Sequence, residues 1–350
     1  MSYTSYAEVV SQVNQQLSLI SEEYINRSGD YSHDYKQLWQ NIADYLSHGG
    51  KRLRPYIVIL SYEAYGGKST KSILPVATAW ELLHAALLMH DDIIDRDNIR
   101  HGKKNISGIY EEKYQSKDSA HFALSTALLA GDLLISGAHD IVWQADISDT
   151  YQKPLHELLK KALFGVVGGE LVDTVSVEKP IMTVDARLVA TQKTAEYSFI
   201  YPLLTGATLA DVSDEEQQLL YSLGESVGLA YQLVDDILGV FGDEGTTGKS
   251  VTSDIAERKR TVLLQETFSH SGLVDQKWLE EVYSLDREIG PSDIDKIKHL
   301  MITSGAKQKL EHEIEVIMQK AEIIISKLHI SGEAKEQFEV LIKKICKRKS

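Results

Sequence analysis

Two stretches of the sequence place adjacent aspartates in apolar surroundings. Asp91 and Asp92 are joined one turn later by Asp95, and a second pair, Asp235 and Asp236, lies among leucine, isoleucine and valine. Burying a carboxylate beside such residues is costly unless it is paired or binds a metal. Oxygen ligands suit Mg²⁺, which keeps several waters and prefers phosphate oxygens as its other ligands. The two groups therefore predict a magnesium site for a phosphorylated substrate. The plainer alternative for each is a solvated acidic helix end.

Basic residues in turns and at helix ends could supply the opposite charge. Lys51, Arg52 and Arg54 follow a double glycine and precede a proline suited to a first helical turn. Basic groups that converge on metal-binding aspartates make sense if a polyanion such as a diphosphate lies between them. Taken singly, each is more often an ordinary surface residue. The residues expected to act on phosphate are Lys51, Arg54, Arg100, Lys193, Lys249 and Lys259.

The segments that must position these groups have the apolar period of helices. In the stretch 80–95, His84, Asp91 and Asp95 share one face, so this helix is apolar at one end and acidic at the other. The polar stretch 96–116 is expected to be a loop. No stretch alternates with period two, which predicts an all-α chain. Helices are expected at about 9–28, 35–48, 55–65, 71–95, 120–139, 153–174, 184–209, 213–241, 254–268, 276–283, 292–304, 306–328 and 333–346.

Length and composition indicate a folded, acidic protein. The 350 residues are 43 % apolar, enough for a sizeable core, and we interpret them as one domain over 1–350. The formal net charge of −14 argues against nucleic-acid binding. The single cysteine, Cys346, excludes an internal disulfide and suits a cytoplasmic location. The sequence starts without a signal-peptide pattern, and it contains no apolar run of the length that predicts a membrane span.

Several of these motifs together resemble those of a known family. Asp-Asp-Ile-Ile-Asp at 91–95 resembles the first aspartate-rich motif of the trans-isoprenyl diphosphate synthases, the polyprenyl synthetase family, in a form like that of geranylgeranyl diphosphate synthases. Asp-Asp-Ile-Leu at 235–238, with its downstream residues, is similar to the second motif. Gly-Lys-Arg-Leu-Arg-Pro at 50–55 resembles the loop that binds isopentenyl diphosphate. Further matches, in the family's order, are Ala130-Gly131-Asp132-Leu133-Leu134, Lys193-Thr194, Gly248-Lys249, Asp254-Ile255 and Lys259-Arg260-Thr261.

The resemblance implies a fold, a set of ligands and a role for each matching residue. It implies a single-domain helical bundle of the isoprenoid synthase type, with a central active-site cavity. It also implies about three Mg²⁺ ions assembled with the substrate diphosphate. The implied metal ligands are Asp91, Asp95 and Asp235, supported by Asp92 and Asp236. The implied contacts to isopentenyl diphosphate are Lys51, Arg54 and His84. The implied contacts to the allylic diphosphate are Arg100, Lys193 and Lys259.

The remaining implied roles concern the reaction itself. Thr194 and Gln232 would lie beside the developing carbocation, and Lys249 would contact the leaving group. The allylic substrate would be dimethylallyl, geranyl or farnesyl diphosphate, and the chain would form a homodimer. Ionisation would leave an allylic cation in a dry apolar pocket, where the double bond of isopentenyl diphosphate attacks it. The released diphosphate is expected to accept the proton.

Three positions depart from the family's pattern. His101 stands where a second arginine usually helps to bind isopentenyl diphosphate, which weakens that contact or passes it to a neighbouring lysine. Gly239 stands where the second motif usually has its third aspartate. Glu170 replaces a glutamine ahead of Asp173, so the roles of both are open. We expect activity to survive these changes.

Product length is expected to depend on the residues that line the helix before the first motif. In the family, aromatic residues four or five positions before that motif stop the product at fifteen carbons. Here these positions are Leu87 and Ala86, which are not aromatic. Trp80 lies eleven residues before Asp91, about 16 Å along a helix, which is roughly the reach of a twenty-carbon product. The sequence therefore predicts geranylgeranyl diphosphate or a somewhat longer product.

Three other functions fit parts of the sequence. A di-metal carboxylate bundle protein would use Glu81 and His84 as a Glu-x-x-His unit, but no second copy of that unit is evident. A non-catalytic partner subunit of a heteromeric synthase would explain His101 and Gly239. A terpene cyclase would share the first aspartate motif but would not need the basic run at 51–54.

Overall fold

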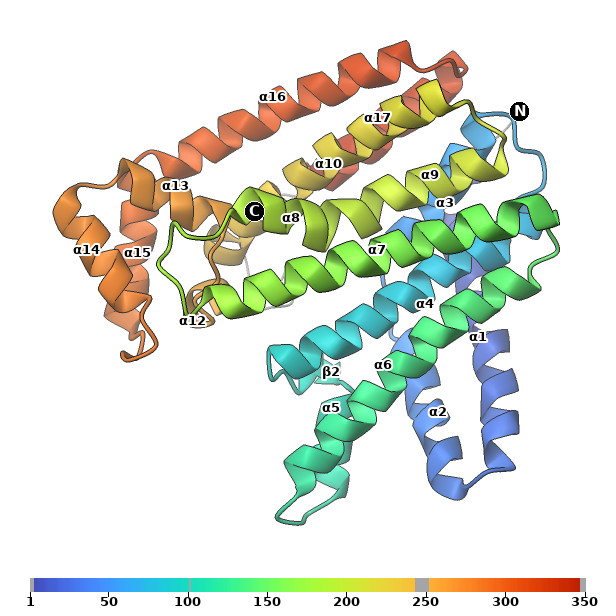
Figure 1. The fold of residues 1–350 in the computed structure, drawn as a ribbon, viewed down its shortest axis with the longest axis horizontal. Coiled ribbons are helices and arrows are strands. Elements are labelled where there is room, and N and C mark those ends of the chain that lie inside the picture. The colour runs from blue at the N-terminus through green and yellow to red at the C-terminus, as the bar shows by residue number, and fades with distance from the viewer. Residues whose placement is uncertain (1–2, 101, 243–251, 347–350) are drawn as a thin grey trace. The chain divides into compact units, whose positions relative to one another are not determined.

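Helices make up nearly all of the regular structure in the computed structural model (Figure 1). It describes residues 3–100, 102–242 and 252–346. The chain forms two compact units, a first of Met1–Leu159 with Pro202–Val212 and a second of Lys160–Tyr201 with Ser213–Ser350. The all-α prediction is confirmed. That residues 1–350 form a single domain stays a prediction.

The first unit contains the first aspartate group and the basic run. Its central helix is α4 (Thr70–Ile94), which packs against α3 (Leu53–Ala64) and α6 (Ser119–Gln144). Of the 25 residues of α4, 13 are buried, so it is a core helix, and Asp91 in its acidic last turn is partly exposed. The other elements are α1 (Tyr6–Gly29), α2 (His33–Ser47), β1 (Ile99–Arg100), β2 (Lys103–Lys104), α5 (Ile106–Lys113), the start of α7 (Asp149–Ser176) and most of α9 (Tyr201–Leu209).

The second unit contains the second aspartate group. This group lies on α10 (Asp214–Phe241), which packs against α16 (Ala306–Lys327) and against the π-helix η1 (Thr191–Ile200). A Cβ atom at Gly228 of α10 would lie 2.3 Å from the Cβ of Ala195, so the close approach of α10 and η1 requires glycine there. The other elements are α8 (Ala186–Ala190), α12 (Ser253–Ala256), α13 (Val262–His270), α14 (Leu273–Val282), α15 (Pro291–Thr303) and α17 (Gly332–Cys346).

Two segments differ from the predicted helix pattern. The stretch expected to be a loop contains the two-residue strands β1 and β2 and then α5. Asn105 begins α5, because its side-chain oxygen accepts a hydrogen bond from the Gly108 N–H at 2.9 Å. The helix expected over 254–268 is split into α12 and α13. Arg258 there has a left-handed φ of 57°, and the Thr261 side chain caps a new helix. In both segments a capping side chain sets where a helix begins, and the apolar period of the sequence does not reveal that position.

Two helices are long and apolar enough to cross a membrane, judged by length and composition alone. In α4, 67 % of the most apolar window is buried inside the protein, as in the core helix of a folded domain. In α6 the figure is 33 %, because part of this helix is an exposed apolar face. The absence of a membrane span therefore stays a prediction.

Candidate active site

The first aspartate group lies at the carboxyl end of α4. Asp91 is in the last turn of the helix, and Asp95 ends it with a backbone N–H that donates to the Asp91 carbonyl at 2.8 Å. Both side chains are partly exposed, whereas the Asp92 side chain is only 2 % exposed. Asp91 and Asp95 are thus one turn apart on the accessible side of the helix, as the sequence predicted. Asp92 points into the protein.

Arg100 binds this aspartate group directly. Its Nε donates to Asp92 Oδ1 at 2.7 Å, and its Nη2 lies 3.2 Å from Asp91 Oδ2. Burial raises the pKa of Asp92 to about 6, and the hydrogen bond and charge of Arg100 oppose that rise. The acidic group of the first unit is therefore balanced by Arg100, a cation that the sequence analysis assigned to a diphosphate.

The basic run 51–54 forms the turn that leads into α3. Gly49, Gly50 and Arg52 all have positive φ, at 94°, 137° and 45°, so the two glycines allow a turn that other residues adopt with strain. Lys51 is exposed and Arg54 is half-buried in the first turn of α3. The N-terminus of a helix carries partial positive charge and unpaired N–H groups, which favour an anion. This turn is therefore suited to phosphate. His84, also assigned to that phosphate, is half-buried on α4 in the same unit.

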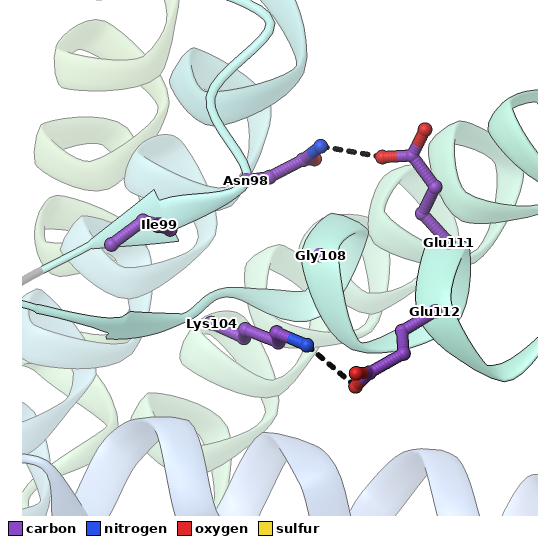
Figure 2. A pocket seen from close by; sticks show the side chains of 6 residues that line it. All are labelled: Asn98, Ile99, Lys104, Gly108, Glu111 and Glu112. Carbon is purple, nitrogen blue, oxygen red and sulfur yellow. Dashed lines mark hydrogen bonds and ion pairs between the residues drawn. The ribbon is translucent and has the colours of Figure 1, made fainter.

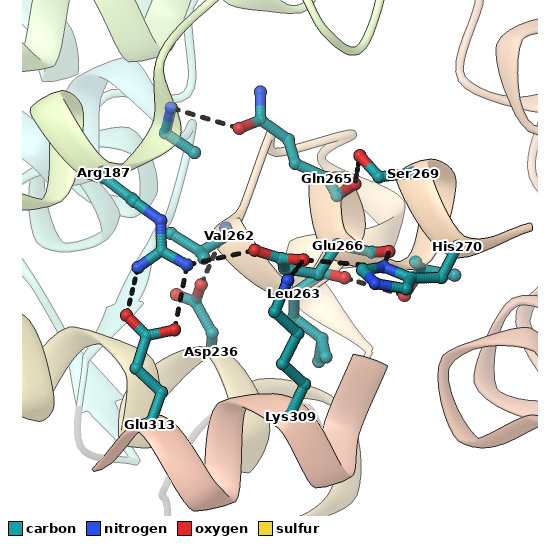
Figure 3. A network of polar contacts seen from close by, with 12 residues as sticks. Arg187, Asp236, Val262, Leu263, Gln265, Glu266, Ser269, His270, Lys309 and Glu313 are labelled. Atoms are coloured by element: carbon teal, nitrogen blue, oxygen red, sulfur yellow. Dashed lines mark hydrogen bonds and ion pairs between the residues drawn. The ribbon is translucent and has the colours of Figure 1, made fainter. Parts of the chain in front are cut away.

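The second aspartate group lies near the carboxyl end of α10, where its two members differ in environment. Asp235 is exposed and Asp236 is buried. Asp236 Oδ2 accepts the Val262 N–H at 3.0 Å, which ties α10 to the start of α13 (Figure 3). Asp236 Oδ1 accepts from Gln232 Nε2 at 2.9 Å, and Gln232 Oε1 accepts from the Thr194 hydroxyl at 2.7 Å. This chain of hydrogen bonds orients Thr194 and Gln232, the two residues that family resemblance would place beside a carbocation.

Burial also changes the proton affinity of Asp236. It raises the pKa of this carboxyl to about 7, and the charges of Asp254 and Asp235 add to the rise. The hydrogen bond from Gln232 opposes it. Asp236 therefore connects helices in the interior, and the exposed Asp235 is the member of the pair that a metal ion could reach.

Lys193 lies on the π-helix η1, within the stretch predicted to be an ordinary helix. Its Nζ lies 2.7 Å from Glu170 Oε2 and 2.8 Å from Asp173 Oδ2, both on α7. A Cβ at Gly169 would lie 2.8 Å from Lys193 N, so η1 and α7 are in close contact at this point. π-Helical turns are frequent at functional sites. The structure thus gives Glu170 and Asp173, whose roles were open, a shared partner.

The remaining expected residues have more varied settings. Lys259 Nζ lies 2.6 Å from Glu257 Oε2. Trp80 is 1 % exposed, and its Nε1 donates to the Thr205 hydroxyl at 3.1 Å. Ala86 is buried and Leu87 is half-buried. His101 and Lys249 lie outside the described residues.

A pocket between the β1–β2 hairpin and α5 contains none of the expected site residues. Figure 2 shows its polar side chains turned toward each other in two pairs. Lys104 Nζ lies 2.6 Å from Glu112 Oε2, and the Asn98 amide donates to Glu111. Ile99 and Gly108 complete the lining. Each charged side chain of this pocket already contacts another polar side chain of the lining, so we assign the pocket no substrate.

The carboxylates of the two aspartate groups fit Mg²⁺ bound together with water and phosphate better than they fit a metal ion whose ligands all come from the protein. Among the described ranges, no three His, Cys, Asp or Glu side chains gather as a metal-binding cluster. Asp91 and Asp95 in the first unit, and separately Asp235 in the second, offer hard carboxylate oxygens, which suit Mg²⁺ because it takes its remaining ligands from water and phosphate. A di-metal carboxylate bundle would use Glu81 as a ligand, but Glu81 Oε1 is 2.6 Å from Arg52 Nη1. That contact counts against this alternative.

Known proteins match most of this chain. Residues 36–301 match the polyprenyl synthetase family. A short chain isoprenyl diphosphate synthase of Methanocaldococcus jannaschii is 35 % identical over 222 residues, which are 63 % of this chain and 62 % of that protein. A geranylgeranyl diphosphate synthase of Methanosarcina mazei is 30 % identical over 305 residues, which are 83 % of this chain and 90 % of that protein.

A solved structure is similar over the whole length. It is the geranylgeranyl pyrophosphate synthase from Corynebacterium glutamicum, complexed with isoprenyl diphosphate and magnesium. The sequences are 26 % identical and the TM-score is 0.91, over 99 % of this chain and 100 % of that chain. The helical fold expected from the sequence is therefore confirmed.

Proposed function

The chain belongs to the polyprenyl synthetase family of trans-prenyltransferases, and we propose that it condenses isopentenyl diphosphate with an allylic diphosphate in a Mg²⁺-dependent reaction. The product is an all-trans prenyl diphosphate of twenty carbons or somewhat more. The observation that carries this proposal lies within the first unit. An anion-binding turn with Lys51 and Arg54 and an acidic helix end with Asp91 and Asp95 belong to the same packed set of helices.

The two kinds of group serve two substrates. Lys51, Arg54 and His84 hold the diphosphate of isopentenyl diphosphate, which needs cations and N–H donors but no metal. Asp91 and Asp95 in the first unit and Asp235 in the second would hold about three Mg²⁺ ions, which would supply Lewis-acid stabilisation of negative charge on the diphosphate. Asp92 and Asp236 orient their helices from the interior, as their buried hydrogen bonds support.

The basic residues of the allylic site exchange partners when substrate binds. Arg100 and Lys193 are each paired with carboxylates of this chain. A diphosphate with its metal ions brings both charges, so each cation can turn from a carboxylate to phosphate at small net cost. Lys259 acts in the same way, and Lys249 is assigned to the leaving group by family resemblance.

The reaction breaks one carbon–oxygen bond and forms one carbon–carbon bond. Arg100 and the lysines stabilise the charge that develops on the diphosphate as it leaves the allylic carbon. Gln232 and Thr194, held by the chain of hydrogen bonds to Asp236, present oxygen atoms to the allylic cation. The double bond of isopentenyl diphosphate attacks that cation, and the released diphosphate takes the proton that is lost.

Trp80 limits the product length in this proposal. The side chains of Ala86 and Leu87 leave room beyond the point where an aromatic residue would stop a fifteen-carbon chain. Trp80 is a large, buried side chain held in one orientation by Thr205, which supports its role as a rigid floor.

We also propose a homodimer in the cytoplasm. On α7, Phe164, Val167 and Leu171 are spaced three and four residues apart and are 85, 55 and 62 % exposed. Exposed apolar stripes of this kind mark protein interfaces, and a second copy of the chain is the commonest partner. Cys346 is a buried free thiol, which is consistent with a reducing compartment.

One assay tests the proposed activity. The purified protein is incubated with labelled isopentenyl diphosphate, Mg²⁺ and either dimethylallyl, geranyl or farnesyl diphosphate, and product length is read by chromatography. We expect products of twenty carbons or more, and no product when a chelator removes Mg²⁺. No condensation by the purified protein with any starter would instead favour a non-catalytic partner subunit.

A further inference from the structure

Arg52 is the middle cation of the basic run, and it is buried. Its side chain is 4 % exposed and uses three nitrogens on three elements. Nη1 donates to Glu81 Oε1 on α4 at 2.6 Å, Nη2 donates to the Leu46 carbonyl of α2 at 2.6 Å, and Nε donates to Asn14 Oδ1 of α1 at 2.9 Å. The Glu81 side chain is 4 % exposed. Arg52 therefore faces the interior, while its neighbour Lys51 is exposed.

The backbone of the turn is shaped around this side chain. Arg52 has a left-handed φ of 45°, which is unfavourable for a residue with a Cβ. A Cβ at Gly50 would lie 2.9 Å from Arg52 Nη1, so the guanidinium occupies the space that a side chain at Gly50 would need. The contacts of Arg52 thus hold a turn that the backbone alone does not favour. In that turn Lys51 points to solvent, and Arg54 enters α3.

We propose that the buried Arg52–Glu81 ion pair is a positioning device for the isopentenyl diphosphate site. This deepens the proposed function and rests on it. Glu81 and His84 are three residues apart on α4 and so share one face of that helix. The ion pair ties the turn that carries Lys51 and Arg54 to the helix that carries His84. The ion pair thereby fixes the distance from Lys51 and Arg54 to His84, the third residue of the isopentenyl diphosphate site.

An ion pair suits this task better than an apolar contact would. Burying two charges costs desolvation free energy, so a buried ion pair is weak evidence of a gain in stability. Glu81 Oε2 is also buried, without a hydrogen-bond partner among the described residues. The planar guanidinium, however, sets three bond directions at once, which a lysine ammonium cannot do. The arrangement therefore specifies geometry, and Arg52 acts through Lys51 and Arg54 without touching substrate.

The test separates positioning from stability. Arg52→Lys keeps the charge but loses the fixed directions, and Glu81→Gln keeps an acceptor oxygen but loses the charge. For both variants we expect KM for isopentenyl diphosphate to rise by at least about tenfold, because small misplacements of binding groups are costly. KM for the allylic diphosphate should stay within about twofold, since its contacts are not displaced.

A matched control replaces an arginine of similar chemistry in the second unit. Arg187 binds Glu313 through Nη1 at 2.5 Å and Glu266 through Nη2 at 3.1 Å (Figure 3). Arg187→Lys should leave both KM values unchanged even if its melting temperature falls. A fall in melting temperature with unchanged KM values in Arg52→Lys would overturn the proposal, as would a parallel rise in both.

Two further measurements cover the other outcomes. If Arg52→Lys does not fold, the same KM measurements are made on Asn14→Ala, which removes one of the three acceptors of the Arg52 side chain. Calorimetry with isopentenyl diphosphate alone measures the affinity of its site in the absence of turnover. The variants should bind this ligand at least about tenfold more weakly than wild type does. Wild-type protein that binds this ligand but does not condense it would refute the proposed activity and not the ion pair's role. Equal binding by wild type and variants would refute that role.

Discussion

Lys193 Nζ lies 2.7 Å from Glu170 Oε2 in the second unit. The side chains are 23 and 18 % exposed, so the pair is partly shielded from solvent. Asp173 adds a second carboxylate to the same ammonium group. The lysine expected to bind a diphosphate thus contacts two carboxylates of its own chain. One of them is Glu170, which departs from the family's motif as described in the sequence analysis.

Glu170→Gln should therefore improve binding of the allylic diphosphate. It removes one negative charge near the incoming anion, which we expect to be worth about 1 kcal/mol, or roughly fivefold in KM. Steady-state kinetics with varied allylic substrate check this expectation. Glu313→Gln, which alters an ion pair of Arg187, is the control and should leave that KM unchanged. A higher KM in Glu170→Gln would mean that the carboxylate itself contributes to binding.

The accessible aspartate of each group should be essential for turnover. Asp91→Ala and Asp235→Ala each remove an accessible metal ligand, so we expect turnover to fall by about two to three orders of magnitude. Both proteins should remain folded, because these side chains are not buried. Turnover and far-ultraviolet circular dichroism are measured together. The exposed Asp146 provides the control, and near-normal turnover in Asp91→Ala would refute the metal assignment.

Replacing Trp80 should lengthen the product. Trp80→Leu shortens a side chain that is 1 % exposed, and chain growth should continue into the space that this leaves. Truncating a buried tryptophan as far as alanine would cost about 3–5 kcal/mol of stability, which makes leucine the safer change. Trp39→Leu, which truncates another buried tryptophan on α2, is the control and should leave the product unchanged. A folded Trp80→Leu variant with the wild-type product would exclude Trp80 as the floor.

The sequence predicted the parts of this protein that depend on repeated local pattern. The acidic end of α4 and the helix that carries Asp235 follow from apolar period and from motifs that keep their spacing. The partners of Arg52 could not be predicted, because Asn14, Leu46 and Glu81 come from three distant segments. One signal was present, since Glu81 is a lone charge in an otherwise apolar run and such a residue needs a buried partner.

The same limit applies to the environment of each aspartate. Adjacent residues on a helix point in different directions, so one member of each pair had to face inward. Which member did so depended on tertiary packing. Asp236 is 3 % exposed, and it accepts a hydrogen bond from the backbone N–H of Val262, which lies 26 residues later in the chain. No pattern around position 236 contains that information.

Disrupting the exposed apolar stripe of α7 should dissociate the proposed homodimer. Phe164→Glu places a charge on a side chain that is 85 % exposed in one chain, where burial against a second copy would be costly. Sedimentation should show a monomer for this variant and a dimer for the wild type. Leu273→Glu is the control, because Leu273 is 76 % exposed on α14 and lies outside the stripe. A wild-type monomer, or a dimer that survives Phe164→Glu, would place any interface elsewhere.

The buried Asp236 should make the metal-free protein less stable as the pH rises. Its pKa is about 7 in the folded chain and 3.8 when exposed, so between these values the folded state holds a proton that the unfolded state has lost. The free energy of unfolding therefore falls as the pH rises from about 4 to about 7. Below about 4 this group has no effect on it, and above about 7 the destabilisation by the buried charge is complete.

Asp236→Asn isolates this contribution. Asparagine cannot ionise, but its single acceptor oxygen can serve either Val262 or Gln232 and not both, so the variant should be less stable than wild type near pH 5. Ionisation of the buried Asp236 destabilises wild type alone. The difference in unfolding free energy between wild type and Asp236→Asn should therefore shrink from pH 5 to pH 8. Urea denaturation in the presence of a chelator measures it at each pH. A difference that is constant or grows with pH would show that Asp236 is already ionised in the folded protein at pH 5.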